Sequence, residues 1–197
     1  MFKSYYIFML DVPKPSMDDL YSYLAMWEET ERYSFWDDAF YKLFIKSFPK
    51  NVELSEIWIK CSVLNDFYNL HILDILPIAK HILNLNIDDR LSKKDYSLVN
   101  DLSKVKIWWK DKTLYSFATK YCAKHCWSDF PIYDKYIDKV LMYFKKKDHF
   151  CDFIKSDLKD YPKFVSILEK FKEKYWLICP FDDLDHYLWQ LGKKYFW

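Results

Sequence analysis

Gly192 is the only glycine among the 197 residues of this chain. Folds built entirely of β-strands use many tight turns with positive φ, and glycine adopts those backbone angles most readily. A chain almost without glycine is therefore expected to fold into helices joined by loops of Asn, Asp, Ser and Pro. The same scarcity excludes the glycine-rich phosphate-binding loops of dinucleotide-binding and P-loop proteins.

The composition indicates a globular protein with a substantial core. Hydrophobic residues make up 51% of the chain, which is enough to exclude a disordered polymer, and 30% are charged, which excludes a membrane protein. The formal net charge of +1 gives no overall positive field that would attract nucleic acid. Arginine occurs only at Arg32 and Arg90, which argues against recognition of base edges by paired Arg hydrogen bonds. Nucleic-acid binding through a local patch of lysines stays open as an alternative.

Apolar residues recur at helical spacing through most of the chain. Residues 1–15 are expected to form an extended lead-in that ends at Pro13 and Pro15, and Ser16 is the expected N-cap of the first helix. The β-branched stretch 57–63 leaves a strand as the alternative within the third helix. Polar turns are predicted over 84–94 and a loop over 104–112. The predicted helices cover approximately residues 16–27, 36–48, 53–68, 72–83, 96–102, 114–127, 131–144, 150–158, 162–175 and 182–195.

The pattern predicts one compact all-α domain of many helices over residues 1–197. An alternative within this prediction is a domain of two lobes, about residues 1–103 and 104–197. Any strand content is expected to be a short pairing near the N-terminus or residues 57–63.

The cysteines indicate a reducing compartment. They form no CxxC pair. The apolar run near the N-terminus, which Lys3 and Asp11 flank, is too short for a signal peptide, and it has no small-residue cleavage site. The longest apolar runs are too short for a membrane span. We therefore expect a cytoplasmic protein, with no membrane association, whose thiols are free: Cys61, Cys122, Cys126, Cys151 and Cys179.

The cluster of Cys122, His125 and Cys126 raises the question of a metal site. It offers at most three ligands, fewer than the four of a structural zinc site, and no second cluster follows. Cys122 and His125 fall on the apolar face of the helix predicted over 114–127. The prediction is that both are core residues and that the protein has no metal and no other cofactor.

Lys120 and Asp134 have the clearest chemical potential. The helix over 114–127 and the helix that Pro131 is expected to open place them near one junction. A neutral lysine is a nucleophile for Schiff-base formation, and a nearby carboxylate can stabilise a cationic sugar or activate water. Lys124 lies one helical turn from Lys120, where a like charge lowers the pKa of the amine. The alternative is a surface lysine pair and an aspartate favoured by a helix dipole.

The segment Tyr115–Asp134 resembles the helix-hairpin-helix DNA glycosylase superfamily, especially its 8-oxoguanine-glycosylase-like branch. That family carries a lysine in its hairpin region and a Pro–aliphatic–Asp at the start of the next helix. Lys120 and Pro131-Ile132-Tyr133-Asp134 are similar to these two elements. Val63-Leu-Asn-Asp-Phe-Tyr68 and Tyr187-Leu-Trp-Gln-Leu-Gly-Lys193 are similar to stretches of bacterial glycosylase-like proteins.

The resemblance implies a bacterial enzyme that flips a base out of DNA and cleaves its N-glycosidic bond, in repair or in defence against phage. It implies Asp134 and Lys120 as catalytic residues, with lyase activity if Lys120 is the nucleophile. A base pocket is expected from Asn65, Tyr68, His125, Tyr133 and Trp189. DNA is the expected partner, because lysines contact phosphates and exposed aromatic rings stack on bases. The predicted contacts are Lys104, Lys106, Trp108, Trp109, Lys110, Lys112 and Lys124.

A catalytically inert helical adaptor that binds nucleic acid or another protein is the second hypothesis. The near-neutral charge, the two arginines and the absence of glycine from residues 111–122 favour it. The pair Lys120 and Asp134, together with the aromatic residues, favours the enzyme.

Overall fold

The structure is a computed structural model that describes residues 12–196. This part of the chain contains ten α-helices and a single two-stranded sheet, so the prediction of a mostly helical protein is confirmed. None of the described helices is both long and apolar enough to cross a membrane. The elements are α1 (Met17–Glu29), α2 (Glu31–Tyr41), α3 (Leu54–Phe67), α4 (Leu76–Leu85), α5 (Ile87–Ser92), α6 (Ser97–Ser103), β1 (Lys104–Ile107), β2 (Lys110–Thr113), α7 (Tyr115–His125), α8 (Lys135–Asp148), α9 (Tyr161–Tyr175) and α10 (Phe181–Tyr195), with a π-helical segment Lys42–Ser47 after α2 and a 3₁₀ turn Lys155–Lys159.

Several helix starts follow from local chemistry. The Ser16 hydroxyl accepts a hydrogen bond from the Asp19 N–H at 3.1 Å and caps α1, as predicted. Pro77 lies in the first turn of α4, where its missing N–H would have had no helical partner. Residues 57–63 belong to α3, so the helix and not the strand alternative is correct for this stretch. Most of the expected lead-in, residues 1–11, lies outside the described residues.

Four segments differ from the predictions. The predicted loop 104–112 is an antiparallel hairpin in which Val105 pairs with Lys112 and packs its side chain into the core. The predicted turn 84–94 contains the short helix α5, because Ile87 and Leu91 bury one helical face. Residues 131–134 are not helical, and α8 begins only at Lys135 because Asp134, with an extended backbone, is its N-cap. A helix was predicted over residues 150–158. The structure instead has a short 3₁₀ turn over Lys155–Lys159, and residues 150–154 are not helical.

Positive φ angles occur at residues other than glycine in the described chain. They are found at Asn69, His71, Asn86, Lys94, Trp108, His149 and Trp176. Each such residue brings its Cβ close to a carbonyl oxygen, at a cost on the order of 1 kcal/mol. The strand pair was missed for this reason, since the hairpin turns at Trp108 without the glycine or asparagine that usually announces a two-residue turn.

Gly192 lies in the last turn of α10, where that helix packs closely against α8. A Cβ added at this position would lie 2.6 Å from the Tyr136 Cβ and 2.9 Å from the Tyr136 carbonyl oxygen. Such distances are shorter than van der Waals contact, so a side chain here would force the helices apart. The only glycine is therefore used for a helix–helix contact and not for a turn.

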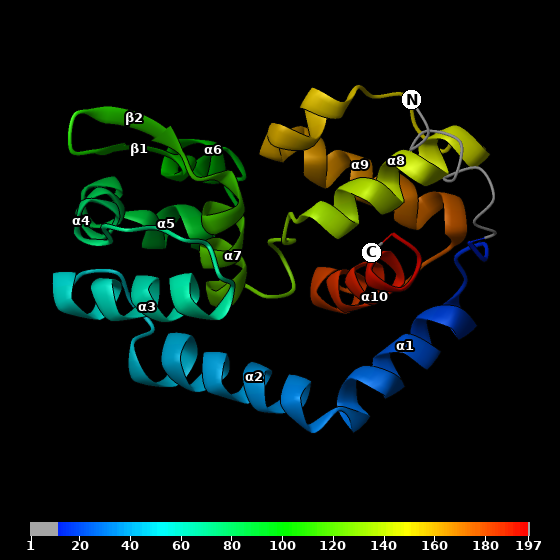
Figure 1. The fold of residues 1–197 in the computed structure, drawn as a ribbon, viewed down its shortest axis with the longest axis horizontal. Coiled ribbons are helices and arrows are strands. Elements are labelled where there is room, and N and C mark those ends of the chain that lie inside the picture. The colour runs from blue at the N-terminus through cyan, green and yellow to red at the C-terminus, as the bar shows by residue number, and fades with distance from the viewer. Residues whose placement is uncertain (1–11, 197) are drawn as a thin grey trace.

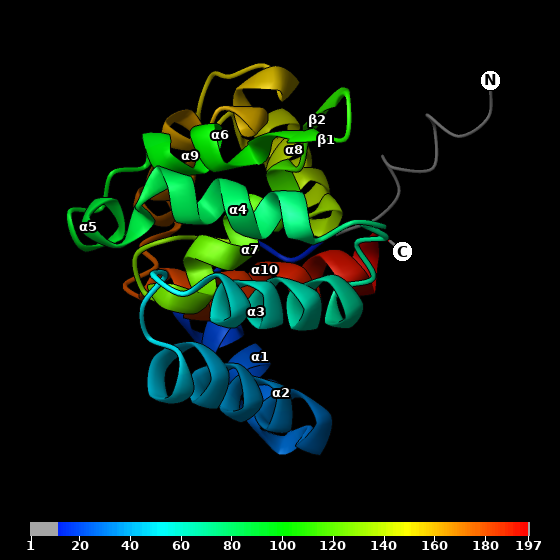
Figure 2. The same cartoon turned by 90° about the vertical axis from the view of Figure 1, so that its left-hand side faces the viewer.

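The helices form two groups with α2 below them in Figure 1. One group holds α3 to α7 and the hairpin, and the other holds α8, α9 and α10 with α1 packed along α10. Figure 2 shows α3 and α4 stacked above α2, with α7 behind them. The segments from both ends of the chain thus share one group. The division into lobes near residue 103 stays a prediction.

Candidate active site

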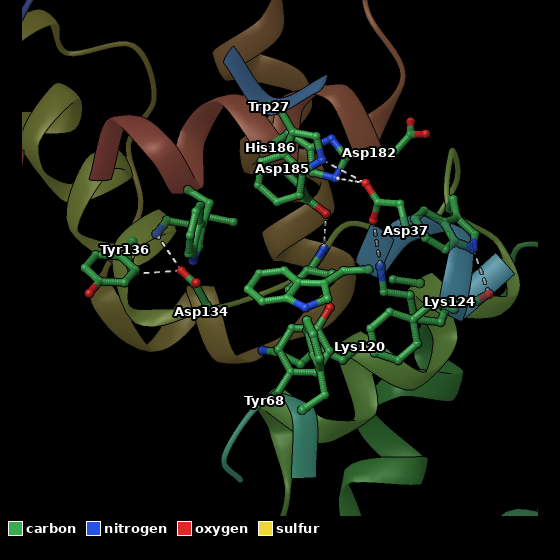
Figure 3. A pocket seen from close by; sticks show the side chains of 18 of the residues that line it. Trp27, Asp37, Tyr68, Lys120, Lys124, Asp134, Tyr136, Asp182, Asp185 and His186 are labelled. Atoms are coloured by element: carbon green, nitrogen blue, oxygen red, sulfur yellow. Dashed lines mark hydrogen bonds and ion pairs between the residues drawn. The ribbon is translucent and has the colours of Figure 1, made fainter. Parts of the chain in front are cut away.

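A pocket of about 370 Å³ lies where α2, α7, α10 and the start of α8 meet. Aromatic side chains form most of its wall, and charged groups project between them (Figure 3). The aromatic residues are Trp27, Trp36, Phe40, Phe67, Tyr68, Trp127, Tyr136 and Trp189. The titratable groups, besides the tyrosines, are Asp37, Lys120, Lys124, Asp134, Asp182, Asp185 and His186. The size and apolar lining suit an organic ligand of modest size.

Lys120 lies on α7 and is buried in this wall. Its ammonium group donates to the Ser116 hydroxyl at 2.7 Å and to the Tyr133 carbonyl at 3.3 Å, and it lies 5.0 Å from the centre of the Tyr68 ring. Burial lowers the pKa of Lys120 to about 8, against the opposing attraction of Asp134 and Asp185. The amine thus titrates close to neutral pH, mainly because of desolvation and not because of Lys124.

Asp134 is the N-cap of α8. Its Oδ1 atom accepts hydrogen bonds from the N–H groups of Tyr136 at 2.7 Å and Ile137 at 2.9 Å. Asp134 lines the same pocket as Lys120, and the Tyr133 carbonyl that binds the lysine directly precedes it. The two residues that the sequence singled out are therefore brought together.

Lys124 is part of the pocket wall and is almost fully buried. Its ammonium group lies 3.6 Å from the centre of the Trp127 ring and 3.8 Å from Asp37 Oδ1. Burial lowers its pKa to about 8. The side chain predicted as a nucleic-acid contact thus reaches into the pocket, where any contact with DNA would be with an inserted nucleotide.

Asp37 links three pocket residues. Its Oδ2 atom accepts a hydrogen bond from Trp27 Nε1 at 2.8 Å and lies 3.6 Å from His186 Nε2. The His186 ring stacks on Trp27 with 3.9 Å between ring centres. Burial lowers the pKa of His186 to about 4, so the imidazole is neutral at pH 7. The group forms a fixed polar edge within an otherwise aromatic wall (Figure 3).

Of the five residues predicted for a base pocket, two line it: Tyr68 and Trp189. Asn65 instead holds the loop after α3, because its side chain exchanges hydrogen bonds with the backbone of Ile72 at 3.0 and 2.9 Å. The His125 ring packs beside Phe44, with Nε2 3.3 Å from Lys60 Nζ. The Tyr133 hydroxyl donates to Asp138 Oδ2 at 2.6 Å, so Tyr133 approaches Lys120 only through its carbonyl.

The hairpin carries the other predicted nucleic-acid contacts, and all are exposed, with Trp108 59% and Trp109 76% accessible. The strand register pairs Lys106 with Asp111 and Ile107 with Lys110. Directly opposed residues of an antiparallel pair share a face. Lys104 and Lys106 therefore lie on one face, and Lys110 and Lys112 lie on the other face with Val105 and Ile107.

The sequence predictions missed most of the titratable residues of the pocket, among them Asp37, Asp182, Asp185 and His186. A signal for one of them exists: Asp185 lies three residues before Leu188, beside the apolar face of the helix predicted over 182–195. A carboxyl group at a core-facing position of an amphipathic helix demands an explanation. Asp37 gives no such signal.

The Cys122–Cys126 cluster lies apart from the pocket, and the Cys122 side chain is fully buried. Within residues 12–196, no three His, Cys, Asp or Glu side chains are grouped so that they could hold a metal ion.

Comparison with known proteins gives one family and one relative. The model of the family HI_0787_N, described as an N-terminal domain, matches residues 19–129. An uncharacterized protein of Haemophilus influenzae is 44% identical over 136 residues, which are 68% of this chain. The chain spans 65% of the length of that relative. No solved structure matches. The family match includes α1 to α7 with Lys120 and ends before Asp134.

Proposed function

We propose that this chain, which belongs to the HI_0787_N family, is a DNA glycosylase-like enzyme that acts on a base flipped into the aromatic pocket. Aromatic side chains can stack on an inserted base, and a buried site excludes water from the reacting sugar. The resemblance of the segment Tyr115–Asp134 to helix-hairpin-helix glycosylases supports the same proposal.

One observation carries the proposal: Lys120 and Asp134 line the same pocket, and the pKa of the lysine is about 8. At pH 7 roughly a tenth of the Lys120 amines would be uncharged, compared with well under a thousandth for a lysine in water. Only the uncharged amine is a nucleophile. Burial therefore provides a competent nucleophile beside a carboxylate, which is the pair that such a reaction uses.

In the proposed reaction the bond between the sugar C1′ and the base nitrogen breaks, and its electron pair leaves with the base. The Asp134 carboxylate stabilises the positive charge that develops on the sugar. The Lys120 amine then forms a bond to C1′ and releases a proton to water. The bond between C1′ and the ring oxygen O4′ breaks, its electron pair goes to O4′, which takes up a proton from water, and the opened sugar is held as a Schiff base. The Asp134 carboxylate keeps its position because the N–H groups of Tyr136 and Ile137 at the start of α8 donate hydrogen bonds to its Oδ1 atom.

Trapping with borohydride is expected to give a covalent protein–DNA adduct with the wild-type protein and none with Lys120→Ala. Borohydride reduces only the Schiff base to a stable bond, so the adduct identifies an amine nucleophile. The assay uses duplexes that carry damaged or phage-modified bases, and adducts are measured by gel electrophoresis. Lys120→Arg keeps the positive charge but cannot form the Schiff base, so it should also fail to trap.

Lys80→Ala is the matched control, because Lys80 is exposed on α4 and lies outside the pocket. This variant should trap as the wild type does. If the wild-type protein releases no base and gives no adduct with any duplex of the panel, the enzyme is ruled out and the inert adaptor takes its place.

The hairpin is the proposed surface for the DNA backbone. The start of α7 directly follows it, and at about 1.5 Å per residue the first residue of that helix lies roughly 8 Å from Lys120 along the axis. One duplex could therefore contact both. Lys104 and Lys106 share the face that does not carry the buried Val105, so we expect these two to contact phosphates.

Charge reversal of Lys104 and Lys106 to Glu should weaken duplex binding and lower the slope of log K against log salt by roughly 1.8, since each lost phosphate contact contributes about 0.9. The same reversal of Lys110 and Lys112, on the opposite face, should have a smaller effect. Fluorescence anisotropy at several salt concentrations measures both slopes. Equal slopes for the two double variants and the wild type would move the contact surface elsewhere.

A further inference from the structure

Asp185 is a buried carboxyl group that the reaction described above does not use. It lies on α10 with 7% of its surface accessible, and it lines the pocket. Its Oδ2 atom accepts a hydrogen bond from the Ile132 N–H at 2.6 Å, whereas its Oδ1 atom is buried and has no hydrogen-bond partner among the described residues. A buried polar atom without a partner costs about 1–3 kcal/mol. A ligand group that reached this carboxyl group would supply the partner that Oδ1 lacks.

The surroundings of Asp185 favour the uncharged carboxylic acid. Burial raises its pKa well above the ordinary value, and the nearby carboxyl groups of Asp134 and Asp182 raise it further, while the Ile132 N–H and Lys124 act in the opposite direction. Because Ile132 donates to Oδ2, the proton of the acid belongs on Oδ1. The ionisable groups that interact with Asp185 are Lys120, Lys124, Asp134, Asp182, Tyr68 and Tyr161.

We propose that Asp185 is the general acid that protonates the departing base, through its unpartnered Oδ1 atom. This inference rests on the proposed glycosylase function. A neutral base leaves more easily once one of its acceptor atoms carries a proton, and in a purine these acceptors are the ring nitrogens N7 and N3. Asp134 and Asp185 then have different tasks, one as carboxylate beside the sugar and the other as acid beside the base, which is how paired carboxyl groups divide acid–base work.

With a purine substrate, the bond between C1′ and N9 breaks, and its electron pair enters the purine ring system. The Asp185 Oδ1–H bond breaks, and its proton goes to N7 or N3, so the base leaves as a neutral molecule and Asp185 is left ionised. The Lys120 amine supplies the new electron pair to C1′ and releases one proton to water. Uptake of a proton from water returns Asp185 to the acid.

Two measurements on the full chain test this. Infrared difference spectra between wild type and Asp185→Asn at pH 7 should contain the carbonyl band of a protonated carboxyl group that the variant lacks. Single-turnover base release should then be compared for duplexes with a neutral purine lesion, such as hypoxanthine or 8-oxoguanine, and with 7-methylguanine. The latter is already cationic and needs no acid.

Asp185→Asn should slow release of the neutral purines by about a hundredfold or more, as expected for loss of a general acid, and should change release of 7-methylguanine little. The amide keeps an acceptor for the Ile132 N–H, so the fold should persist. Asp183→Asn is the control, since Asp183 is on the same helix and does not line the pocket.

Absence of the infrared band overturns the acid role whatever the activity, since Asp185 would be ionised. Equal losses on neutral and cationic bases also overturn it, because the residue would then only shape the pocket. If the wild type releases no base, the proposed function fails and this inference with it.

Discussion

The Asp134→Asn variant is expected to lose base release by about a hundredfold or more, the usual effect of removing one group that stabilises charge in a transition state. An amide has nearly the same shape as the carboxylate and carries no charge. Asparagine is also a good N-cap, so its side-chain oxygen should still accept from the N–H groups of Tyr136 and Ile137. The free energy of unfolding should therefore change by less than about 1 kcal/mol.

Single-turnover base release and urea unfolding measure the two quantities separately. Asp134→Ala is the companion variant, because it removes both the charge and the cap. It should show the same loss of base release and an additional loss of stability of about 1 kcal/mol. Full activity of Asp134→Asn would mean that the carboxylate acts only as a helix cap.

Lys60→Met is expected to lower the free energy of unfolding by about 3–5 kcal/mol, the cost of breaking a buried polar network. Lys60 lies on α3 and is fully buried. Its ammonium group donates to the carbonyls of Phe48 at 3.0 Å and Lys50 at 2.8 Å, and to Asn51 Oδ1 at 2.8 Å. Methionine fills a similar volume but leaves the two carbonyls without this donor. Asn51 Oδ1 would keep only the Tyr121 hydroxyl, which donates to it at 2.6 Å.

The effect of Lys60→Met should depend on pH. Burial lowers the pKa of Lys60 to about 8, whereas the lysine of the unfolded chain titrates near 10.5. Between these values the unfolded chain binds more protons than the folded one, so the Lys60 contribution to stability rises with pH. The stability difference between wild type and variant should therefore grow from about pH 8 towards pH 10.

Urea unfolding at pH 7, 8, 9 and 10 tests both the size of the stability loss in Lys60→Met and its dependence on pH. Lys80→Met is the control, and since Lys80 is exposed on α4 its effect should stay within about 0.5 kcal/mol at every pH. A loss as small as that for Lys60→Met would show that water satisfies the three acceptors. A difference that does not vary with pH would show that the Lys60 pKa is normal.

The sequence predicted the helices well because their apolar faces are local patterns. It failed where a residue had to do what its type does rarely: Trp108 turns the hairpin with a positive φ of 56°, and nothing in its neighbours announces this. Asp134 was predicted near the start of a helix that Pro131 opens. In the structure the helix α8 starts later, directly after Asp134, because the Asp134 side chain is its N-cap.

The candidate site was predictable only in part. Lys120 and Asp134 are 14 positions apart, and both lie in the segment that resembles helix-hairpin-helix glycosylases. They could therefore be assigned to one site from the sequence. Asp37 and His186 come from α2 and α10, and only the packing of the two chain ends brings them within 3.6 Å of each other. A burial-lowered pKa such as that of Lys120 also depends on neighbours distant in sequence.

The close contact at Gly192 joins two helices that both contribute residues to the pocket. Tyr136, which Gly192 touches, is two residues after Asp134 on α8, and Asp185 is two helical turns before Gly192 on α10. The two carboxyl groups that we assign to the sugar and to the base are thus carried by helices whose separation depends on a missing methyl group. Gly192→Ala would therefore be expected to change the distance between these groups while leaving both carboxyl groups in the sequence. In the proposed function, that distance limits the length of the nucleotide that fits between Asp185 and Asp134.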